Sequence, residues 1–161
     1  MSEETANVEL EKSAKTRKGL PVRTQARQAA LQALYQWQMN PSSVAELASQ
    51  FISNPSISLG SSEFFHALLQ GVLTQVSALD EAFSPMLDRP LTQLNPVELS
   101  VLRLGAYELA YMPETPYRVI INEAVELAKT FGAEGGHAYV NGVLDKLAQQ
   151  LRTTEVNADK A

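Results

Sequence analysis

Residues 95–109, NPVELSVLRLGAYEL, carry the clearest helix signal in the chain. Asn95 is a residue type that caps helix N-termini, Pro96 is favoured at the first helical position, and Glu98 completes a capping box. Behind this start, apolar residues recur at helical spacing. They are Leu99, Leu102, Ala106 and Leu109. The segment therefore predicts an amphipathic helix with one face in a core.

Helical spacing of apolar residues continues on both sides of this segment. It predicts further helices within residues 24–39, 43–54, 64–83, 116–132 and 140–151. The one strand-like run, Val119 to Ile121, is only three residues long and passes directly into helical spacing. The sequence therefore predicts an all-α protein of six to seven helices.

Length and composition limit the domain organisation. A chain of 161 residues with 45% hydrophobic residues suits one helical domain, expected over residues 22–152. Residues 1–21 lack apolar periodicity and are expected to form a disordered leader, and residues 153–161 a disordered tail. The absence of cysteine, of a signal peptide and of an apolar run of membrane-spanning length predicts a cytoplasmic protein without a membrane segment.

Charge is unevenly distributed along the chain. The formal net charge is -5, yet residues 12–45 contain six of the basic residues and no acid. The overall charge excludes general attraction to polyanions as the main binding force. A local basic segment can still bind a polyanion, and the acidic remainder of the chain can bind a basic partner. A basic tail that is only solvated gives the same charge pattern.

Groups that support catalysis or metal binding are scarce. The two histidines, His66 and His137, form no metal-binding pattern, and there is no cysteine ligand. The glycines at 132, 135 and 136 lack the lysine of a phosphate-binding loop and lie between predicted helices. We therefore expect no enzymatic activity, no metal and no cofactor.

The first predicted helix carries a row of residues suited to binding RNA. Arg23, Arg27, Leu31 and Tyr35 follow one another every four residues, so they form a ridge beside the apolar face. Guanidinium groups bind phosphates through two hydrogen bonds, and an aromatic ring can stack on an unpaired base. Tyr35 at this spacing is equally typical of a residue at the edge of the core.

Several motifs resemble the NusB family of transcription antitermination factors. Residues 116–132, PYRVIINEAVELAKTFG, are similar to the family's most distinctive motif, and residues 139–145, YVNGVLD, to its signature F-V-N-G-V-L. Residues 94–109 resemble its central helix. With Ala26-Arg27 and Tyr35-Gln36-Trp37 the resemblance covers about residues 22–152. Asn122 and Asn141, within these motifs, are expected to fix helix packing by hydrogen bonding.

The resemblance implies a fold, a function and a set of binding residues. It implies two packed helical subdomains and a non-catalytic protein that binds boxA-type single-stranded RNA with the ribosomal protein NusE, within the transcription elongation complex on ribosomal RNA operons. The family's RNA surface maps to Arg23, Arg27, His137 and Tyr139, the last replacing a phenylalanine. Tyr35 and Glu98 match positions at the junction with NusE. Some members self-associate, so a homodimer is possible in principle.

The chain departs from the family at two places. It has Arg23-Thr24-Gln25-Ala26-Arg27 where several consecutive bases are common, and Ala138 where a lysine is common. We therefore predict about two to four phosphate contacts and modest affinity for RNA alone, increased by the partner.

Two alternative functions remain at this point. One is a protein adaptor that does not contact RNA. The other is the N-terminal type of domain found in ribosomal RNA cytosine methyltransferases, which resembles the same helical fold. A methyl-donor domain needs more than about 100 further residues in an alternating strand and helix pattern. No such pattern is present up to Ala161, so the enzyme is the weaker alternative.

Overall fold

The computed structural model describes residues 19–160, and in this range it contains helices, turns and loops but no strand. The chain divides into two compact units, residues 1–74 and residues 75–161. The all-α class and the division into two helical units are therefore confirmed. Residues 1–18, most of the expected leader, lie outside the described residues.

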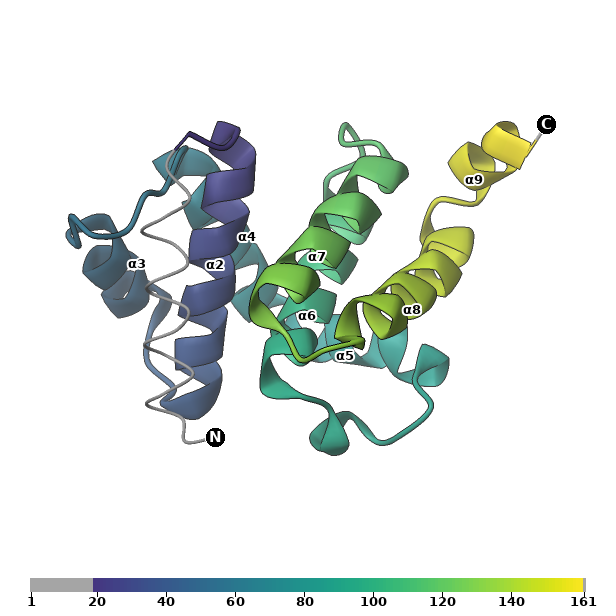
Figure 1. Cartoon of the computed structure of the whole chain (residues 1–161), viewed down its shortest axis with the longest axis horizontal. Coiled ribbons are helices and arrows are strands. Elements are labelled where there is room, and N and C mark those ends of the chain that lie inside the picture. Colours follow the sequence, from purple (N-terminus) through teal and green to yellow (C-terminus); the bar gives the residue numbers. More distant parts are fainter. Residues whose placement is uncertain (1–18, 161) are drawn as a thin grey trace. The chain divides into compact units, whose positions relative to one another are not determined.

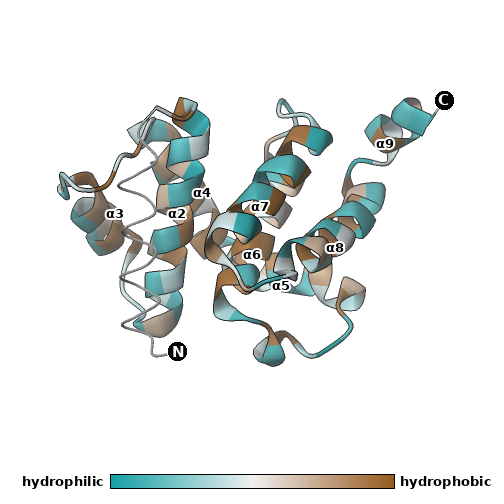
Figure 2. Cartoon of the chain, viewed as in Figure 1, coloured by the Kyte–Doolittle hydropathy of each residue, from teal (hydrophilic) through white to brown (hydrophobic). Residues whose placement is uncertain are grey.

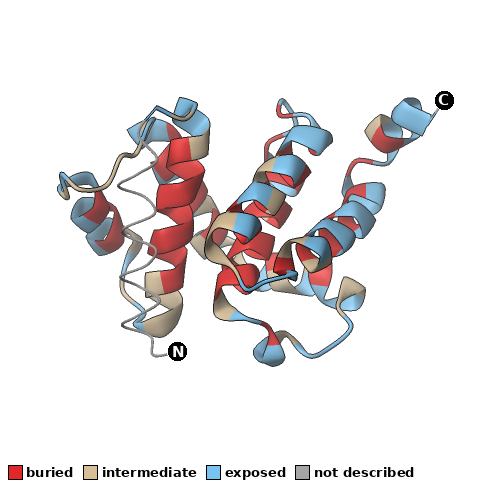
Figure 3. Ribbon diagram, viewed as in Figure 1, coloured by how far each residue is buried: buried red, intermediate tan, exposed pale blue. Residues whose placement is uncertain are grey.

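In its described part, residues 19–74, the first unit contains three helices: α2 (Val22–Met39), α3 (Val44–Ile52) and α4 (Ser62–Thr74) (Figure 1). Helix α2 packs against both α3 and α4. Every residue of α2 from Gln25 to Tyr35 is buried, as the red middle of this helix in Figure 3 shows. The predicted start of α3 is also present, because the Ser43 hydroxyl accepts a hydrogen bond from the Glu46 backbone N–H at 3.1 Å. The sequence therefore predicted α2 and α3 as separate helices.

The core of the first unit is built from alanine and leucine of α2 against aromatic and aliphatic side chains of α3 and α4. The Phe51 and Phe65 rings stack with their centroids 6.0 Å apart. The loop before α4 needs glycine at position 60, where φ is +63° and a Cβ atom would overlap the backbone carbonyl of Val22. This close approach holds the loop against the beginning of α2.

The second unit contains the remaining helices. They are α5 (Val76–Phe83), η1 (Ser84–Met86), η2 (Leu91–Gln93), α6 (Pro96–Tyr111), α7 (Tyr117–Phe131), α8 (Gly136–Leu151) and α9 (Thr153–Lys160). In Figure 2, α7 and α8 alternate between hydrophilic and hydrophobic colours around their axes, as amphipathic helices do.

Helix α6 is the centre of the second unit, because α5, α7 and α8 all pack against it. Its predicted N-cap is present, with the Asn95 side chain accepting hydrogen bonds from the backbone N–H groups of Val97 and Glu98 at 2.9 and 3.3 Å. Arg103 binds Asp80 of α5 through two hydrogen bonds of 2.9 Å each. Together these contacts fix the start of α6 and its orientation against α5.

Two expectations about helix boundaries are wrong. The single helix expected within residues 64–83 is interrupted at Gln75, whose backbone has φ -107° and ψ 14° and belongs to neither α4 nor α5. Helix α4 packs on α2 and α3, whereas α5 packs on α6 and α8, so tertiary packing overrides the continuous apolar spacing.

The disordered tail expected over residues 153–161 is also wrong, because residues 153–160 form helix α9. Val156 is the one buried residue of this helix, so hydrophobic periodicity could not reveal it. With the interrupted helix, α9 brings the α-helices of residues 19–160 to eight, one above the expected range.

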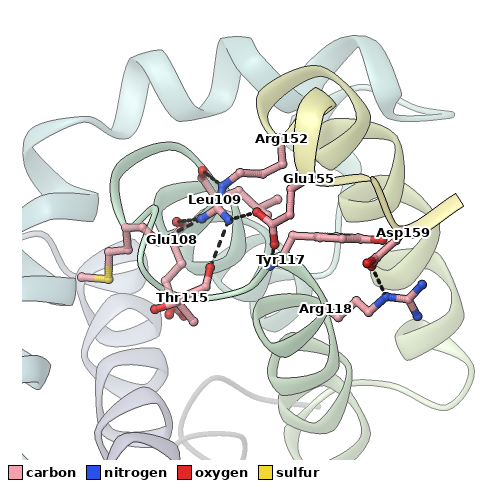
Figure 4. Close-up of polar contacts among 9 residues, drawn as sticks. Glu108, Leu109, Thr115, Tyr117, Arg118, Arg152, Glu155 and Asp159 are labelled. Carbon is pink, nitrogen blue, oxygen red and sulfur yellow. Dashed lines mark hydrogen bonds and ion pairs between the residues drawn. The ribbon is translucent and has the colours of Figure 1, made fainter. Parts of the chain in front are cut away.

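Arg152 holds α9 to the rest of the second unit (Figure 4). Its buried guanidinium donates hydrogen bonds to four backbone carbonyls at the end of α6 and in the following turn, at 2.8 to 3.2 Å. These belong to Glu108, Leu109, Met112 and Thr115. It also pairs with Glu155, which accepts the backbone N–H of Tyr117 at 2.8 Å. Arg152 and Glu155 therefore supply hydrogen-bond partners to backbone groups at the end of α6 and at the start of α7.

We predict that Arg152→Ala lowers the free energy of unfolding by about 3 to 5 kcal/mol, because it leaves buried carbonyls and Glu155 without their donor. Arg152→Lys recovers only part of this loss, since an ammonium cannot reproduce the guanidinium fork. Urea unfolding measures both changes. Arg118→Ala, which removes an exposed ion pair with Asp159, is the control and costs less than about 1 kcal/mol. Equal losses for Arg152→Ala and Arg118→Ala would contradict this role.

Candidate nucleic-acid interface

The two predicted arginines of the first unit share one aromatic ring. The guanidinium carbons of Arg23 and Arg27 lie 4.5 and 5.2 Å from the ring centroid of Phe64 on α4. Arg23 is exposed, so its cation remains open to solvent beside the Phe64 ring. Arg27 is only 3% exposed and faces Phe64. The two residues therefore differ in how readily each can reach a phosphate.

Tyr35 lies on the same helix and is buried. Its burial agrees with the alternative in which Tyr35 belongs to the edge of the core. Its role at a partner junction remains a prediction. Of the four residues of the predicted ridge, Arg23 is thus the one that is exposed.

The other predicted RNA-binding residues lie in the first turn of α8. Gly135 precedes this helix with a left-handed φ of +82°, which favours glycine. His137 and Tyr139 are half-buried and Ala138 is exposed. The turn therefore presents a ring, an imidazole and a small side chain at the start of one helix.

A short loop from elsewhere in the second unit fixes Tyr139. The Tyr139 hydroxyl accepts a hydrogen bond from the backbone N–H of Asp88 at 3.2 Å. The guanidinium carbon of Arg89 lies 4.9 Å from the Tyr139 ring centroid. Arg89 in turn binds both carboxylate oxygens of Asp88, at 2.7 and 3.0 Å. These contacts orient the ring at its edge and on one face.

The contacts of this cluster shift the pKa values of its ionisable groups. The hydrogen bond from Arg89 is the main cause that lowers the pKa of Asp88 from its ordinary 3.8 to about 2. Burial raises the pKa of the Tyr139 hydroxyl. At neutral pH the cluster therefore contains an ionised carboxylate, a guanidinium and a neutral phenol.

The Glu98 side chain lies against Gly136, in the first turn of α8. It is 8% exposed, and a Cβ atom at position 136 would lie 2.6 Å from its carboxyl carbon. The carboxylate thus occupies the space that any larger residue at position 136 would need. A negative charge at a helix N-terminus is also electrostatically favourable. Glu98 therefore positions the start of α8, a role that the sequence did not reveal.

The structure groups the predicted residues by unit. It brings Arg23 and Arg27 together on Phe64 in the first unit, and His137 and Tyr139 together on α8 in the second. Sequence analysis missed Asp88 and Arg89, which lie in an irregular loop between two prolines and follow no helical spacing.

The expectation that Asn122 and Asn141 are buried packing residues is wrong, because both are exposed on the outer faces of α7 and α8. The positions of Asn122 and Asn141 in the helical repeat were compatible with a buried or an exposed face of the helix. Their side chains are therefore available to solvent.

The described residues offer groups for binding rather than for metal chemistry. In residues 19–160 no three His, Asp or Glu side chains are placed to hold a metal ion. Nor does any helix in that range have the length and apolar character needed to cross a membrane. The groups gathered at the surface are cations and a fixed aromatic ring, which suit a polyanion carrying planar bases.

These features define a small all-α binding protein. The model of the NusB family matches residues 24–149, so the chain belongs to the NusB family. It is 53% identical to the transcription antitermination protein NusB of Alcanivorax borkumensis over 135 residues, which cover 84% of this chain and 90% of that protein. Such relatives are named transcription antitermination proteins.

Two solved structures show the same fold. NusB of T. maritima superposes with a TM-score of 0.72 at 30% identity, covering 80% of this chain and 91% of that one. A chain from the crystal structure of the antitermination factors NusB and NusE in complex with dsRNA gives 0.68 at 25% identity, covering 80% and 97%. The resemblance noted in the sequence is therefore confirmed at the level of fold and family.

We predict that the Asp88 carboxyl titrates with a midpoint near 2 and that Arg89→Ala returns its pKa toward 3.8. A carboxyl whose pKa is lowered on folding adds stability above its ordinary pKa, and this contribution is lost as the pH falls through the lowered value. An NMR titration of side-chain carboxyls measures the shift. Asp159, whose pKa Arg118 lowers, is the control and stays unchanged in Arg89→Ala. An unshifted Asp88 in the parent chain would show that the pair is not formed.

We also predict opposite effects of alanine at two glycines of α8. Gly136→Ala displaces the Glu98 carboxylate and lowers the free energy of unfolding by about 1 to 3 kcal/mol. Gly142→Ala meets no atom within 4 Å and raises it by up to about 1 kcal/mol, because alanine favours the helix. Thermal or urea unfolding compares the two variants, and a stabilising Gly136→Ala would refute the contact with Glu98.

Proposed function

We propose that this chain is a transcription antitermination factor that binds boxA-type single-stranded RNA together with the ribosomal protein NusE. The observation that carries the proposal is the Tyr139 ring, held at the start of α8 by the Asp88 backbone in a chain of the NusB family. A fixed ring loses little conformational freedom when a base stacks on it. The similar structure of NusB and NusE in complex with dsRNA supports NusE and an RNA as the kinds of partner.

The proposed RNA contacts follow the accessibility of the side chains. Arg23 supplies a cation, His137 supplies hydrogen bonds and Tyr139 supplies the stacking surface. Arg27 reaches a phosphate only after its guanidinium leaves Phe64, so its substitution affects folding as well as binding. Direct binding therefore depends mainly on the three accessible residues.

The proposed partner contacts use Tyr35 and Glu98. Both are buried in the chain, so they act on the partner through the surface that they hold in place. The net charge of -5 favours a basic ribosomal protein, because complementary charge accelerates and orients association. In this proposal the chain works in the cytoplasm, within the elongation complex on ribosomal RNA operons.

Different observations bear on the methyltransferase domain and on the protein adaptor. Relatives that match over most of their own length are named antitermination proteins, which disfavours the methyltransferase domain. A protein adaptor without RNA contact remains the alternative, and a homodimer formed through the same face would compete with RNA. Binding experiments separate these possibilities.

We predict that a boxA-like RNA binds more tightly than a scrambled RNA or a duplex of the same length, and that Tyr139→Ala weakens boxA binding about tenfold, as the loss of one stacked base would. The log of the affinity should fall with the log of salt concentration by about 0.7 per phosphate contact. Fluorescence anisotropy at two salt concentrations, with and without NusE, measures these changes.

Tyr111→Ala is the matched control, because Tyr111 is 47% exposed and lies at the opposite end of α6 from Glu98. It should leave RNA binding within about twofold of the parent chain. Equal binding of boxA and scrambled RNA, unaffected by Tyr139→Ala, would favour the adaptor. Analytical sedimentation of the chain without RNA measures whether it forms a homodimer.

A further inference from the structure

Arg89 is an exposed cation that none of the predicted sites includes. It lies between η1 and η2, in residues 87–90, and its side chain is 47% exposed. Its neighbour Asp88 is 60% exposed, so both ends of the ion pair are open to solvent. The pair can therefore exchange partners without uncovering a core.

The guanidinium of Arg89 is held in one orientation by two neighbours. Its Nε and Nη2 atoms donate to the two carboxylate oxygens of Asp88, at 2.7 and 3.0 Å. Its guanidinium carbon lies over the Tyr139 ring, 4.9 Å from the centroid. The guanidinium thus lies directly on the Tyr139 ring, for which we propose stacking on RNA.

The geometry of this fork matches a phosphate as well as a carboxylate. Both groups present two oxygens to the parallel N–H groups of a guanidinium. Ala138 leaves the first turn of α8 without a cation. Arg89 is therefore the positive charge placed directly against the proposed stacking ring.

We propose that Arg89 binds an RNA phosphate beside Tyr139, and that Asp88 occupies the guanidinium fork until the phosphate replaces it. This inference rests on the proposed RNA-binding function. The Asp88–Arg89 pair is exposed and therefore weak, so its exchange for a phosphate is readily reversible. After the exchange the Asp88 carboxylate stays near the phosphate and opposes it. The two neighbouring residues thus have opposite effects on RNA affinity.

The chain provides a closely matched control for Arg89. Arg118 is also exposed, pairs with Asp159 at 2.5 Å and lies over the ring of Tyr117, with its guanidinium carbon 5.8 Å from the centroid. It has the same kind of carboxylate and aromatic neighbours at the α7–α9 contact. Comparing the two arginines separates a phosphate contact from a general change in net charge.

The test is a titration of the full chain with boxA-like RNA at several salt concentrations. Arg89→Ala should weaken binding about tenfold and reduce the salt slope by about 0.7, the value of one phosphate contact. Arg89→Lys should keep the slope but bind less tightly, because it keeps the charge and loses the fork. Asp88→Asn should strengthen binding about twofold or more, since it removes a repelling charge. Arg118→Ala should stay within about twofold of the parent chain.

The outcomes distinguish this inference from the proposed function. If the parent chain prefers boxA and Tyr139→Ala weakens binding, but Arg89→Ala behaves as Arg118→Ala does, then the proposed function stands and the role of Arg89 is overturned. Weaker binding by Asp88→Asn would overturn the exchange. If neither Tyr139→Ala nor Arg89→Ala changes binding, the proposed function itself fails. Unfolding curves of each variant confirm that binding is compared between folded chains.

Discussion

The closure of α6 at its C-terminal end is the interaction on which the second unit depends. The last carbonyls of a helix have no partner within it, and in a buried helix water cannot supply one. Arg152 donates to the carbonyls of Glu108 and Leu109 in the last turn of α6 and to those of Met112 and Thr115 in the turn that follows. It also donates to Glu155, which accepts the backbone N–H of Tyr117 at the start of α7. One side chain thereby connects the end of α6 with the start of α7 and with α9.

The opposite end of α6 determines the geometry of the candidate interface. Asn95 caps this end, and Glu98, one turn later, fills the space under Gly136. The first turn of α8 therefore rests on the first turn of α6, and Tyr139 takes its position from that support. The loop with Asp88 and Arg89, about 50 residues before Tyr139 in the chain, contacts the same ring.

The sequence predicted the parts of the structure that depend on apolar spacing and caps. The helices around Trp37, Phe51 and Leu144 follow this rule, and so does the N-cap at Asn95. Helix α9 could not be predicted in this way, because polar contacts of Arg152 and Glu155 hold it. The interruption at Gln75 was missed since the apolar spacing continues across it. In the site, Tyr139 and Arg23 were found from motif and charge, whereas Arg89 depends on a loop whose position no local pattern specifies.

The cation over Tyr139 limits how many bases can stack on this ring. Arg89 covers one face of the ring, and the hydroxyl at its edge is engaged by the backbone of Asp88. At most one face remains for a base while the guanidinium stays in place. The ring can therefore end a stack of bases but cannot lie between two of them. A strand bound in this way would place a single unpaired base on the tyrosine.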